Sequence, residues 1–316
     1  MKVGLIGAGK WGENHLRNLL KMHRYRSIYS LYVCDSNQKV ISKLPPNINY
    51  CSDYKYLSGI VDCVVIATPS STHYEIGKYF LENNTHVLIE KPMALTVDEC
   101  EELISIAKSK KLVLMVGHLF RYHPAVNYIK TQIAKGKFGD IYYIVSNRLA
   151  FGEPRKDMGV LHALSVHDID IFYWLLNKDI DIKSIQSSIS DFNLSKFEVF
   201  VQLIFKINQT LCLSQDTWIS PIGGKQRFLY VVGSLKSAFI DYLEPNKVHI
   251  SNTKILKGNF DFKETKVVNV SNIEPLKEEL YDFIKCCSTG ESPVADSTSG
   301  LNTIKVVSKI LRYKNV

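Results

Sequence analysis

A glycine-rich hexapeptide near the start of the chain has the residue types and spacing of a phosphate-binding turn. It consists of Gly7, Ala8, Gly9, Lys10, Trp11 and Gly12. The first glycine permits a tight turn, the second lets the backbone approach a pyrophosphate, and the third allows a helix to pack closely on a strand. A helix that begins here presents free amides and the positive end of its dipole to phosphates. The pattern predicts a dinucleotide site, and the alternative is a glycine-rich turn that binds nothing.

An acidic residue follows this turn at the distance that a dinucleotide site requires. Asp35 lies at the end of the next expected strand, about 20 residues after the last glycine. Its carboxylate can accept hydrogen bonds from the adenosine ribose hydroxyls and would repel a 2′-phosphate. No arginine immediately follows Asp35. The sequence therefore predicts NAD as the cofactor in preference to NADP.

The elements that position these residues alternate between strand and helix through about residue 118. Apolar strands are expected at 2–6, 30–34, 63–67, 86–89 and 113–116, with helical stretches at 13–23, 72–83 and 97–110 between them. Strands that are apolar throughout are typical of a parallel sheet covered on both faces. We therefore predict an α/β Rossmann domain over residues 1–120.

The second part of the chain has a different order of expected elements, with several strands in succession. Helices are expected near 124–135, 166–176, 275–288 and 301–312, and strand-like runs at 141–147, 199–207, 210–217, 228–232 and 237–242. Turn residues join several of these runs, which indicates antiparallel pairing. The pattern predicts an antiparallel sheet backed by helices over residues 121–316.

Composition narrows the class of protein. The 316 residues carry a formal charge of +8, but the lysines are scattered, so solvated helix surface is favoured over a nucleic-acid-binding stripe. The seven cysteines form no CxxC pair and no metal-like spacing, which predicts reduced thiols and no metal site. No stretch approaches the roughly 18 apolar residues of a membrane span, and no apolar signal region precedes the first strand. A cytoplasmic protein with no nucleic-acid or membrane partner is expected.

Four further motifs carry a family resemblance. They are Ala67-Thr68-Pro69-Ser70-Ser71-Thr72-His73, Glu90-Lys91-Pro92-Met93-Ala94, Gly117-His118-Leu119-Phe120-Arg121-Tyr122-His123-Pro124-Ala125 and Val166-His167-Asp168-Ile169-Asp170. Together with the glycine motif they resemble the glucose-fructose oxidoreductase, inositol dehydrogenase and rhizopine-catabolism family, written Gfo/Idh/MocA. The resemblance implies that residues 121–316 form an α+β domain with an open, mostly antiparallel sheet that binds substrate and supports oligomers. It further implies that the substrate is held between the two domains. It also implies that Thr68, Pro69, Ser70, His73, Glu90, Lys91 and Pro92 join the glycine turn and Asp35 in binding the cofactor.

Lys91 and His167 are the catalytic candidates that the resemblance implies. The lysine of the Glu-Lys-Pro motif lies beside the nicotinamide and the reacting hydroxyl in the family, and Lys91 follows the carboxyl end of a buried strand, where ligands bind in open α/β sheets. A histidine at the position of His167 exchanges the hydroxyl proton, a task that suits an imidazole titrating near neutrality. The alternatives are a surface lysine and a buried structural histidine.

One departure from the family pattern concerns the acid that many members carry four residues before this histidine. Here that position is Ala163, whose methyl group cannot orient an imidazole. The work then falls to Lys91 and His167 or to another acid. Asp157 and Asp168 are candidates for that acid, and a surface role for either is the alternative.

The substrate prediction rests on a resemblance to nucleotide-sugar members of the family, such as UDP-N-acetylglucosamine 3-dehydrogenases. It is carried by Arg155 to Asp170 and by the segment from Asp216 to Pro221, which Lys225 and Arg227 follow. An arginine fork suits a diphosphate, whereas an exposed basic hairpin turn is the alternative. The predicted substrate contacts are Lys91, Arg121, Tyr122, Arg155, Asp157, His167, Lys225 and Arg227.

We therefore expect an NAD-dependent oxidoreductase that transfers a hydride between nicotinamide and a hydroxyl-bearing carbon of a sugar or nucleotide sugar, in a homodimer or homotetramer built through the C-terminal sheet. A free-sugar or myo-inositol dehydrogenase of the same family is one alternative. A catalytically weak NAD-binding sensor is another, because the acid at position 163 is missing.

Overall fold

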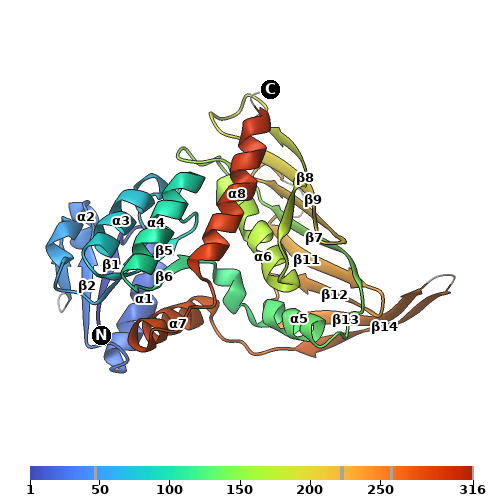
Figure 1. The fold of residues 1–316 in the computed structure, drawn as a ribbon, viewed down its shortest axis with the longest axis horizontal. Coiled ribbons are helices and arrows are strands. Elements are labelled where there is room, and N and C mark those ends of the chain that lie inside the picture. Colours follow the sequence, from blue (N-terminus) through green and yellow to red (C-terminus); the bar gives the residue numbers. More distant parts are fainter. Residues whose placement is uncertain (46–47, 221–223, 257–258, 315–316) are drawn as a thin grey trace. The chain divides into compact units, whose positions relative to one another are not determined.

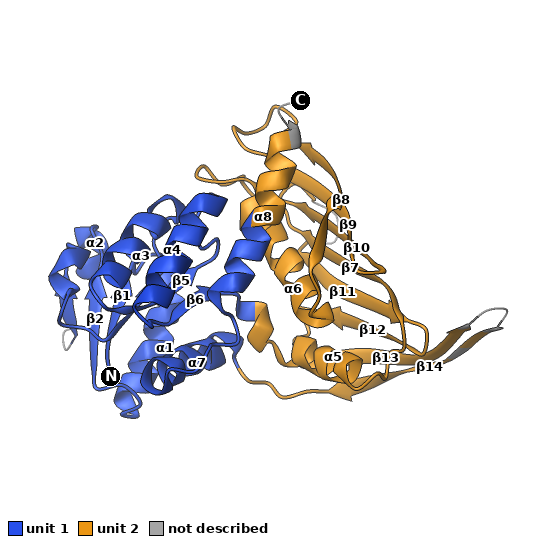
Figure 2. Cartoon of the chain, viewed as in Figure 1, with its two compact units in different colours: residues 1–119, 274–304 blue, residues 120–273, 305–316 orange. Residues whose placement is uncertain are grey.

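The computed structural model describes residues 1–45, 48–220, 224–256 and 259–314. The chain forms two compact units, one of residues 1–119 and 274–304 and the other of residues 120–273 and 305–316 (Figure 2). The first unit thus includes residues 274–304, which come from the second half of the chain. The predicted division into 1–120 and 121–316 places that segment in the second domain and stays a prediction.

The first unit is built on a six-stranded parallel sheet in the order β3-β2-β1-β4-β5-β6 (Figure 1). The strands are β1 (Lys2–Ile6), β2 (Ser30–Cys34), β3 (Asn49–Cys51), β4 (Cys63–Ile66), β5 (His86–Glu90) and β6 (Leu114–Gly117). Its helices include α1 (Gly12–Arg24), α2 (Gln38–Ile41), α3 (His73–Glu82), α4 (Val97–Ser109) and α7 (Pro275–Thr289). The strand order reverses between β1 and β4, and ligands bind at such switch points in open α/β sheets. The predicted Rossmann fold is confirmed.

Helix α7 comes from the end of the chain but packs on α1 in the first unit (Figure 1). At its start, Glu274 accepts two hydrogen bonds from Arg17, at 2.5 and 3.0 Å, and one from Asn18 at 2.9 Å. The hydrogen bond from Arg17 is the main cause that holds the pKa of Glu274 at about 2. This contact ties the late segment to the helix that follows the glycine turn.

The second unit contains an eight-stranded sheet in the order β14-β13-β12-β11-β7-β10-β9-β8. The strands are β7 (Ile141–Leu149), β8 (Ile180–Ser190), β9 (Phe200–Ile207), β10 (Thr210–Thr217), β11 (Gln226–Gly233), β12 (Lys236–Asp241), β13 (Lys247–Leu256) and β14 (Asn259–Asn269). All neighbouring strands are antiparallel except β7 and β10. The prediction of an open, mostly antiparallel sheet is confirmed.

Helices cover one face of this sheet (Figure 1). They are α5 (Pro124–Ala134), α6 (Val166–Leu176) and the last part of α8 (Ser297–Lys314), which begins in the first unit. The core lies between them and inward side chains of alternating strand residues, such as Leu229 and Val231 of β11. In the described part of the chain, no helix combines the length and apolarity needed to cross a membrane.

Candidate cofactor site and catalytic residues

Three glycines of the turn after β1 meet different packing demands. Gly7 has a φ of +89°, and a Cβ there would lie 2.8 Å from the carbonyl oxygen of Ala67. A Cβ at Gly12 would lie 2.0 Å from the carbonyl oxygen of Gly7. A Cβ at Gly9, by contrast, would meet no described atom within 4 Å. The packing of the chain therefore requires the first and third glycines, while Gly9 leaves room for a ligand to approach the backbone.

Asp35 connects the end of β2 to this turn. Its Oδ2 accepts a hydrogen bond from the backbone N–H of Ala8 at 2.8 Å, and its Oδ1 accepts one from the N–H of Asn37 at 2.8 Å. These contacts fix the carboxylate beside the glycine turn, where an adenosine ribose would be expected. The open backbone at Gly9 and the fixed acid together fit a dinucleotide such as NAD. Lys10 and Trp11 lie exposed on the same turn.

His73 joins the loops that follow β4 and β5. Its ring is 1% exposed, with Nδ1 at 2.7 Å from the carbonyl oxygen of Pro92 and Nε2 at 2.9 Å from that of Thr68. Burial lowers the pKa of this imidazole. Ser70 is also buried between the two loops, and Thr72 donates a hydrogen bond to the Thr68 hydroxyl at 2.8 Å. The observed contacts of His73 are with the protein backbone, so its direct contact with a cofactor stays a prediction.

Glu90, the last residue of β5, lies in a buried network with the glycine turn and α1. Its Oε1 accepts hydrogen bonds from the Trp11 indole at 2.5 Å and lies 2.7 Å from His15 Nε2, and its Oε2 accepts one from the backbone N–H of Lys91 at 3.2 Å. Burial alone would raise the pKa of Glu90, but His15, Trp11 and the charge of Lys91 outweigh it and lower the pKa. The ionised carboxylate thereby couples the turn to Lys91.

His15 was not among the predicted site residues. It lies three residues after the last glycine, on the buried face of α1 with Leu16 and Leu19. A histidine within an apolar helix stripe is the signal that could have identified it, because a buried imidazole needs a polar partner. Lys91 is half-buried and precedes the cis peptide bond to Pro92.

Arg121 and Tyr122, two predicted substrate contacts, lie in the interior of the second unit. The Arg121 guanidinium makes three hydrogen bonds to Asp170 of α6, at 2.7 to 3.1 Å, and lies 4.8 Å from the Trp174 ring centroid. Tyr122 is 9% exposed. The contacts of Arg121 with Asp170 are those of a structural ion pair, and substrate contact by either residue stays a prediction.

His167 occupies the first turn of α6 and is half-buried. Its ring meets the ring of Phe120 edge to face, with centroids 5.1 Å apart. A π-helical turn, Leu161–Ser165, precedes it and contains the buried Ala163. Lys91 belongs to the first unit and His167 to the second, so their action in one site stays a proposal.

The two acids considered as substitutes for the missing carboxylate have other partners. Asp157 makes hydrogen bonds to Arg155 at 2.6 and 2.9 Å on the exposed surface. Asp168 is fully buried, and its Oδ1 accepts hydrogen bonds from Arg148 Nε at 2.8 Å and Ser146 Oγ at 2.7 Å.

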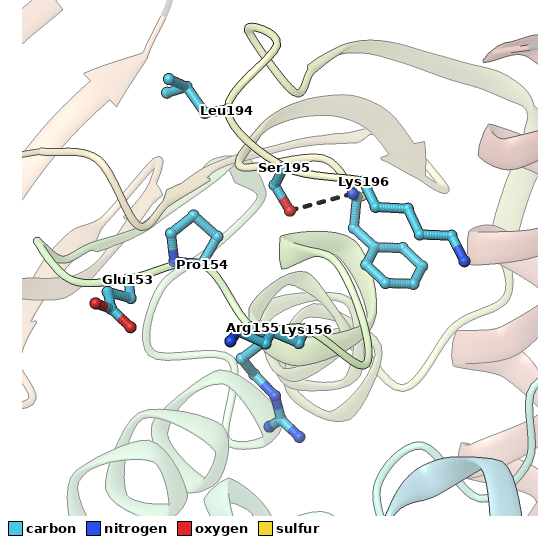
Figure 3. A pocket seen from close by; sticks show the side chains of 8 residues that line it. Glu153, Pro154, Arg155, Lys156, Leu194, Ser195 and Lys196 are labelled. Carbon is cyan, nitrogen blue, oxygen red and sulfur yellow. Dashed lines mark hydrogen bonds between the residues drawn. The ribbon is translucent and has the colours of Figure 1, made fainter.

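The basic residues predicted for a diphosphate lie in different surroundings. Arg155 and Lys156 line a surface pocket of about 480 Å³ together with the 194–197 loop (Figure 3). Lys225 is exposed ahead of β11. Arg227 is half-buried on the inner face of β11, opposite Arg148 of β7, and burial lowers its pKa. Pro221, in the segment that carries the nucleotide-sugar resemblance, lies outside the described residues.

Comparison with known proteins shows similarity to oxidoreductases over part of the chain. Residues 1–118 match the model of the oxidoreductase family with an NAD-binding Rossmann fold, GFO_IDH_MocA. The chain is 30% identical over 190 residues to UDP-N-acetylglucosamine 3-dehydrogenase of Acidithiobacillus ferrooxidans, covering 58% of each protein. It is 27% identical over 189 residues to inositol 2-dehydrogenase of Salmonella typhimurium, covering 57% of this chain and 55% of the relative. The matched part is thus less than two thirds of either relative.

The fold comparison extends over nearly the whole chain. A solved structure of the A. ferrooxidans UDP-N-acetylglucosamine 3-dehydrogenase is similar with a TM-score of 0.81 and 23% identity, covering 98% of this chain and 96% of that chain. At this identity the similarity shows the fold. The glycine turn, Asp35 and the matched family model show that residues 1–118 form an NAD-binding Rossmann domain similar to that of the Gfo/Idh/MocA oxidoreductases.

Proposed function

We propose that this protein is an NAD-dependent dehydrogenase that acts on a hydroxyl-bearing carbon of a sugar nucleotide, with UDP-N-acetylglucosamine as the first substrate to test. The observation that carries the proposal is the coupling of the glycine turn to Lys91 through the buried carboxylate of Glu90. This link joins the backbone of Lys91 to the turn that we expect to hold the dinucleotide. The similarity to the A. ferrooxidans enzyme supports the choice of substrate.

Each protein group has a defined task in the proposed oxidation. Bound NAD supplies the acceptor for the hydride that leaves the ring carbon. The Lys91 ammonium hydrogen-bonds the reacting oxygen and stabilises the negative charge that develops on it. The neutral His167 imidazole accepts the hydroxyl proton, so that a ketone and an imidazolium result. General base catalysis of this kind typically contributes about 10² to 10⁴ in rate.

A substrate panel tests this function. The purified protein is incubated with NAD and, separately, with UDP-N-acetylglucosamine, other UDP-sugars, free sugars and myo-inositol, while NADH absorbance is followed. Turnover of a UDP-sugar, with no turnover of the corresponding free sugar, supports the proposal. Turnover of myo-inositol or a free sugar alone would replace it by the runner-up activity, which the similarity to inositol 2-dehydrogenase favours.

The buried Ala163 supports a second candidate, an NAD-binding sensor without turnover, because no carboxylate occupies the position that many family members use. The same panel separates the two functions. Tight NAD binding by calorimetry with no turnover on any member of the panel would favour the sensor. NADP is included in both assays, and equal affinity for NADP would contradict the assigned role of Asp35.

We propose further that the outer face of the eight-stranded sheet forms a homo-oligomer interface. Rings of Phe228, Tyr230, Phe239 and His249 contact one another on this face across β11, β12 and β13, and Tyr230 is 42% exposed. Clustered exposed aromatic residues are typical of interfaces. Light scattering of the wild type should give a dimer or tetramer mass, and Tyr230→Glu should reduce it. A monomeric wild type would contradict the proposal.

A further inference from the structure

The ring of Phe120 is the centre of an aromatic and charged cluster in the second unit. Its centroid lies 5.1 Å from that of His167, 4.9 Å from that of Tyr242 and 6.1 Å from that of His123. The guanidinium carbon of Arg148 lies 4.3 Å from the same centroid. Phe120 therefore contacts the proposed catalytic histidine on one side and a buried cation on another.

Arg148 is held in place by groups that cannot readily exchange with water. It is 1% exposed, and its Nε donates to Asp168 Oδ1 at 2.8 Å. Ser146 donates to the same carboxylate oxygen at 2.7 Å. Burial alone would lower the pKa of Arg148, but its neighbours, the charge of Asp168 foremost, outweigh burial and raise the pKa, so the guanidinium stays charged. A fixed cation over an aromatic face restrains the ring beneath it.

Asp168 connects Arg148 to the backbone next to His167. Asp168 and His167 are neighbours in the first turn of α6, and Asp168 is fully buried against β7. The backbone of His167 is therefore anchored through Asp168 and Arg148, while its ring is bounded by Phe120 at an interplanar angle of 79°. The same buried ion pair thus supports both the backbone and the ring neighbour of His167.

We propose that Phe120 is a positioning residue for His167, supported by the Arg148 and Asp168 ion pair. This inference rests on the proposed function in that it takes His167 as the group that accepts the proton. The edge-to-face contact with Phe120 restrains the orientation of the His167 ring. Phe120 itself does not touch the reacting atoms in this proposal.

Imidazole dynamics test the proposal without any substrate. The full-length protein is prepared with ¹³C at the Cε1 position of its nine histidines, and the His167 signal is assigned by its loss in His167→Ala. In Phe120→Leu, ¹³C relaxation should show increased motion of the His167 ring. The matched control is Phe192→Leu, in an exposed phenylalanine whose ring contacts Phe200, which should leave His167 relaxation unchanged. Unchanged relaxation in Phe120→Leu would overturn the proposal.

A second variant protects this test against misfolding. If Phe120→Leu does not fold, Phe120→Met supplies a flexible side chain that fills similar space without an aromatic edge. The expected result is the same increase in His167 motion, and a rigid His167 ring in this variant overturns the proposal. Neither relaxation measurement needs turnover. Failure to find a substrate therefore counts only against the proposed function, and the relaxation data still test whether Phe120 positions His167.

Kinetics provide a second readout once a substrate is found. Phe120→Leu should lower kcat about 2- to 10-fold, the range expected for loss of one aromatic pair, with the KM for NAD unchanged. In a His167→Ala background the same substitution should have no further effect on kcat. An equal loss in both backgrounds would show a general structural role and overturn the proposal.

Discussion

The two units position their functional residues by different physical means. In the first unit, local backbone geometry makes the site. One turn contains two glycines that packing requires and one that leaves room for a ligand, and an acid follows at the end of the next strand. In the second unit, side chains from β7, α6 and the residues before α5 meet in a buried cluster around Phe120. A turn-based site is encoded in a few adjacent residues, whereas the cluster depends on strand register.

The largest expected effect tests the catalytic end of the first unit. Lys91→Met removes the ammonium and keeps much of the side-chain length, so kcat should fall about 10²- to 10⁴-fold. NAD affinity by calorimetry should change much less. Lys108→Met, on the exposed surface of α4, is the control and should retain activity. Retention of most activity in the Lys91 variant would remove the proposed role of this residue.

The pH dependence of stability tests the second unit. Burial, followed by the charge of Arg148, lowers the pKa of His123 to about 4, from 6.5. As the pH drops, His123 is protonated in the unfolded state before it is protonated in the folded state. The free energy of unfolding therefore falls between pH 6.5 and pH 4, and the loss is complete below pH 4. The expected loss is about 3 kcal/mol. Urea unfolding at several pH values should show this slope.

His123→Phe provides the comparison for that measurement. The variant keeps an aromatic ring beside Phe120 and Tyr242 but has no proton to bind, so its stability should depend less on pH across the same interval. Parallel pH profiles for the wild type and the variant would contradict the assigned environment of His123.

A matched pair of glycine variants separates packing from ligand binding in the first unit. Gly12→Ala places a Cβ 2.0 Å from a carbonyl oxygen and should destabilise the protein by roughly 1–3 kcal/mol. Gly9→Ala meets no described atom within 4 Å, so its melting temperature should stay close to that of the wild type while NAD affinity falls. Equal melting temperatures for the two variants would contradict the assignment of different tasks.

The smallest effect concerns the attachment of α7 to α1. The pKa of Glu274 is held at about 2, mainly by its hydrogen bond from Arg17, below an ordinary value of 4.5. Its contribution is therefore fully present above pH 4.5 and is lost as the pH falls towards 2. Because solvent screens this partly exposed pair, Glu274→Gln should cost only about 0.2–1 kcal/mol at neutral pH. The difference in stability from the wild type should vanish at acidic pH.

The sequence predicted the first unit well because its signals are local. The apolar strands β1, β2, β4, β5 and β6 and the glycine turn were all expected, and the structure contains them. The short strand β3 was missed, since Asn49–Cys51 contains no apolar run. β3 is the edge strand and pairs with β2, and its own residues carry no pattern that indicates a strand.

The second unit was less predictable because its polar core depends on distant strands. Arg148 follows Ile144 and Ser146 at alternating positions on the inward face of β7. A charged residue at an inward position of a strand is the signal that was available. Its partner Asp168 was noted only as a candidate active-site acid. The contact between them requires β7 to meet α6, and periodicity in either segment does not specify that contact. Strands β8, β13 and β14 also escaped prediction.

The return of α7 to the first unit has a consequence for the order in which the protein folds. During synthesis, residues 1–119 emerge long before residues 274–304, and residues 120–273 of the second unit are made between them. The nascent Rossmann sheet therefore lacks the helix that packs on α1 until residues 275–289 have been made. A release of the chain at residue 120 would leave the α1 surface that contacts α7 open to water, which exposes it to chaperones and to aggregation.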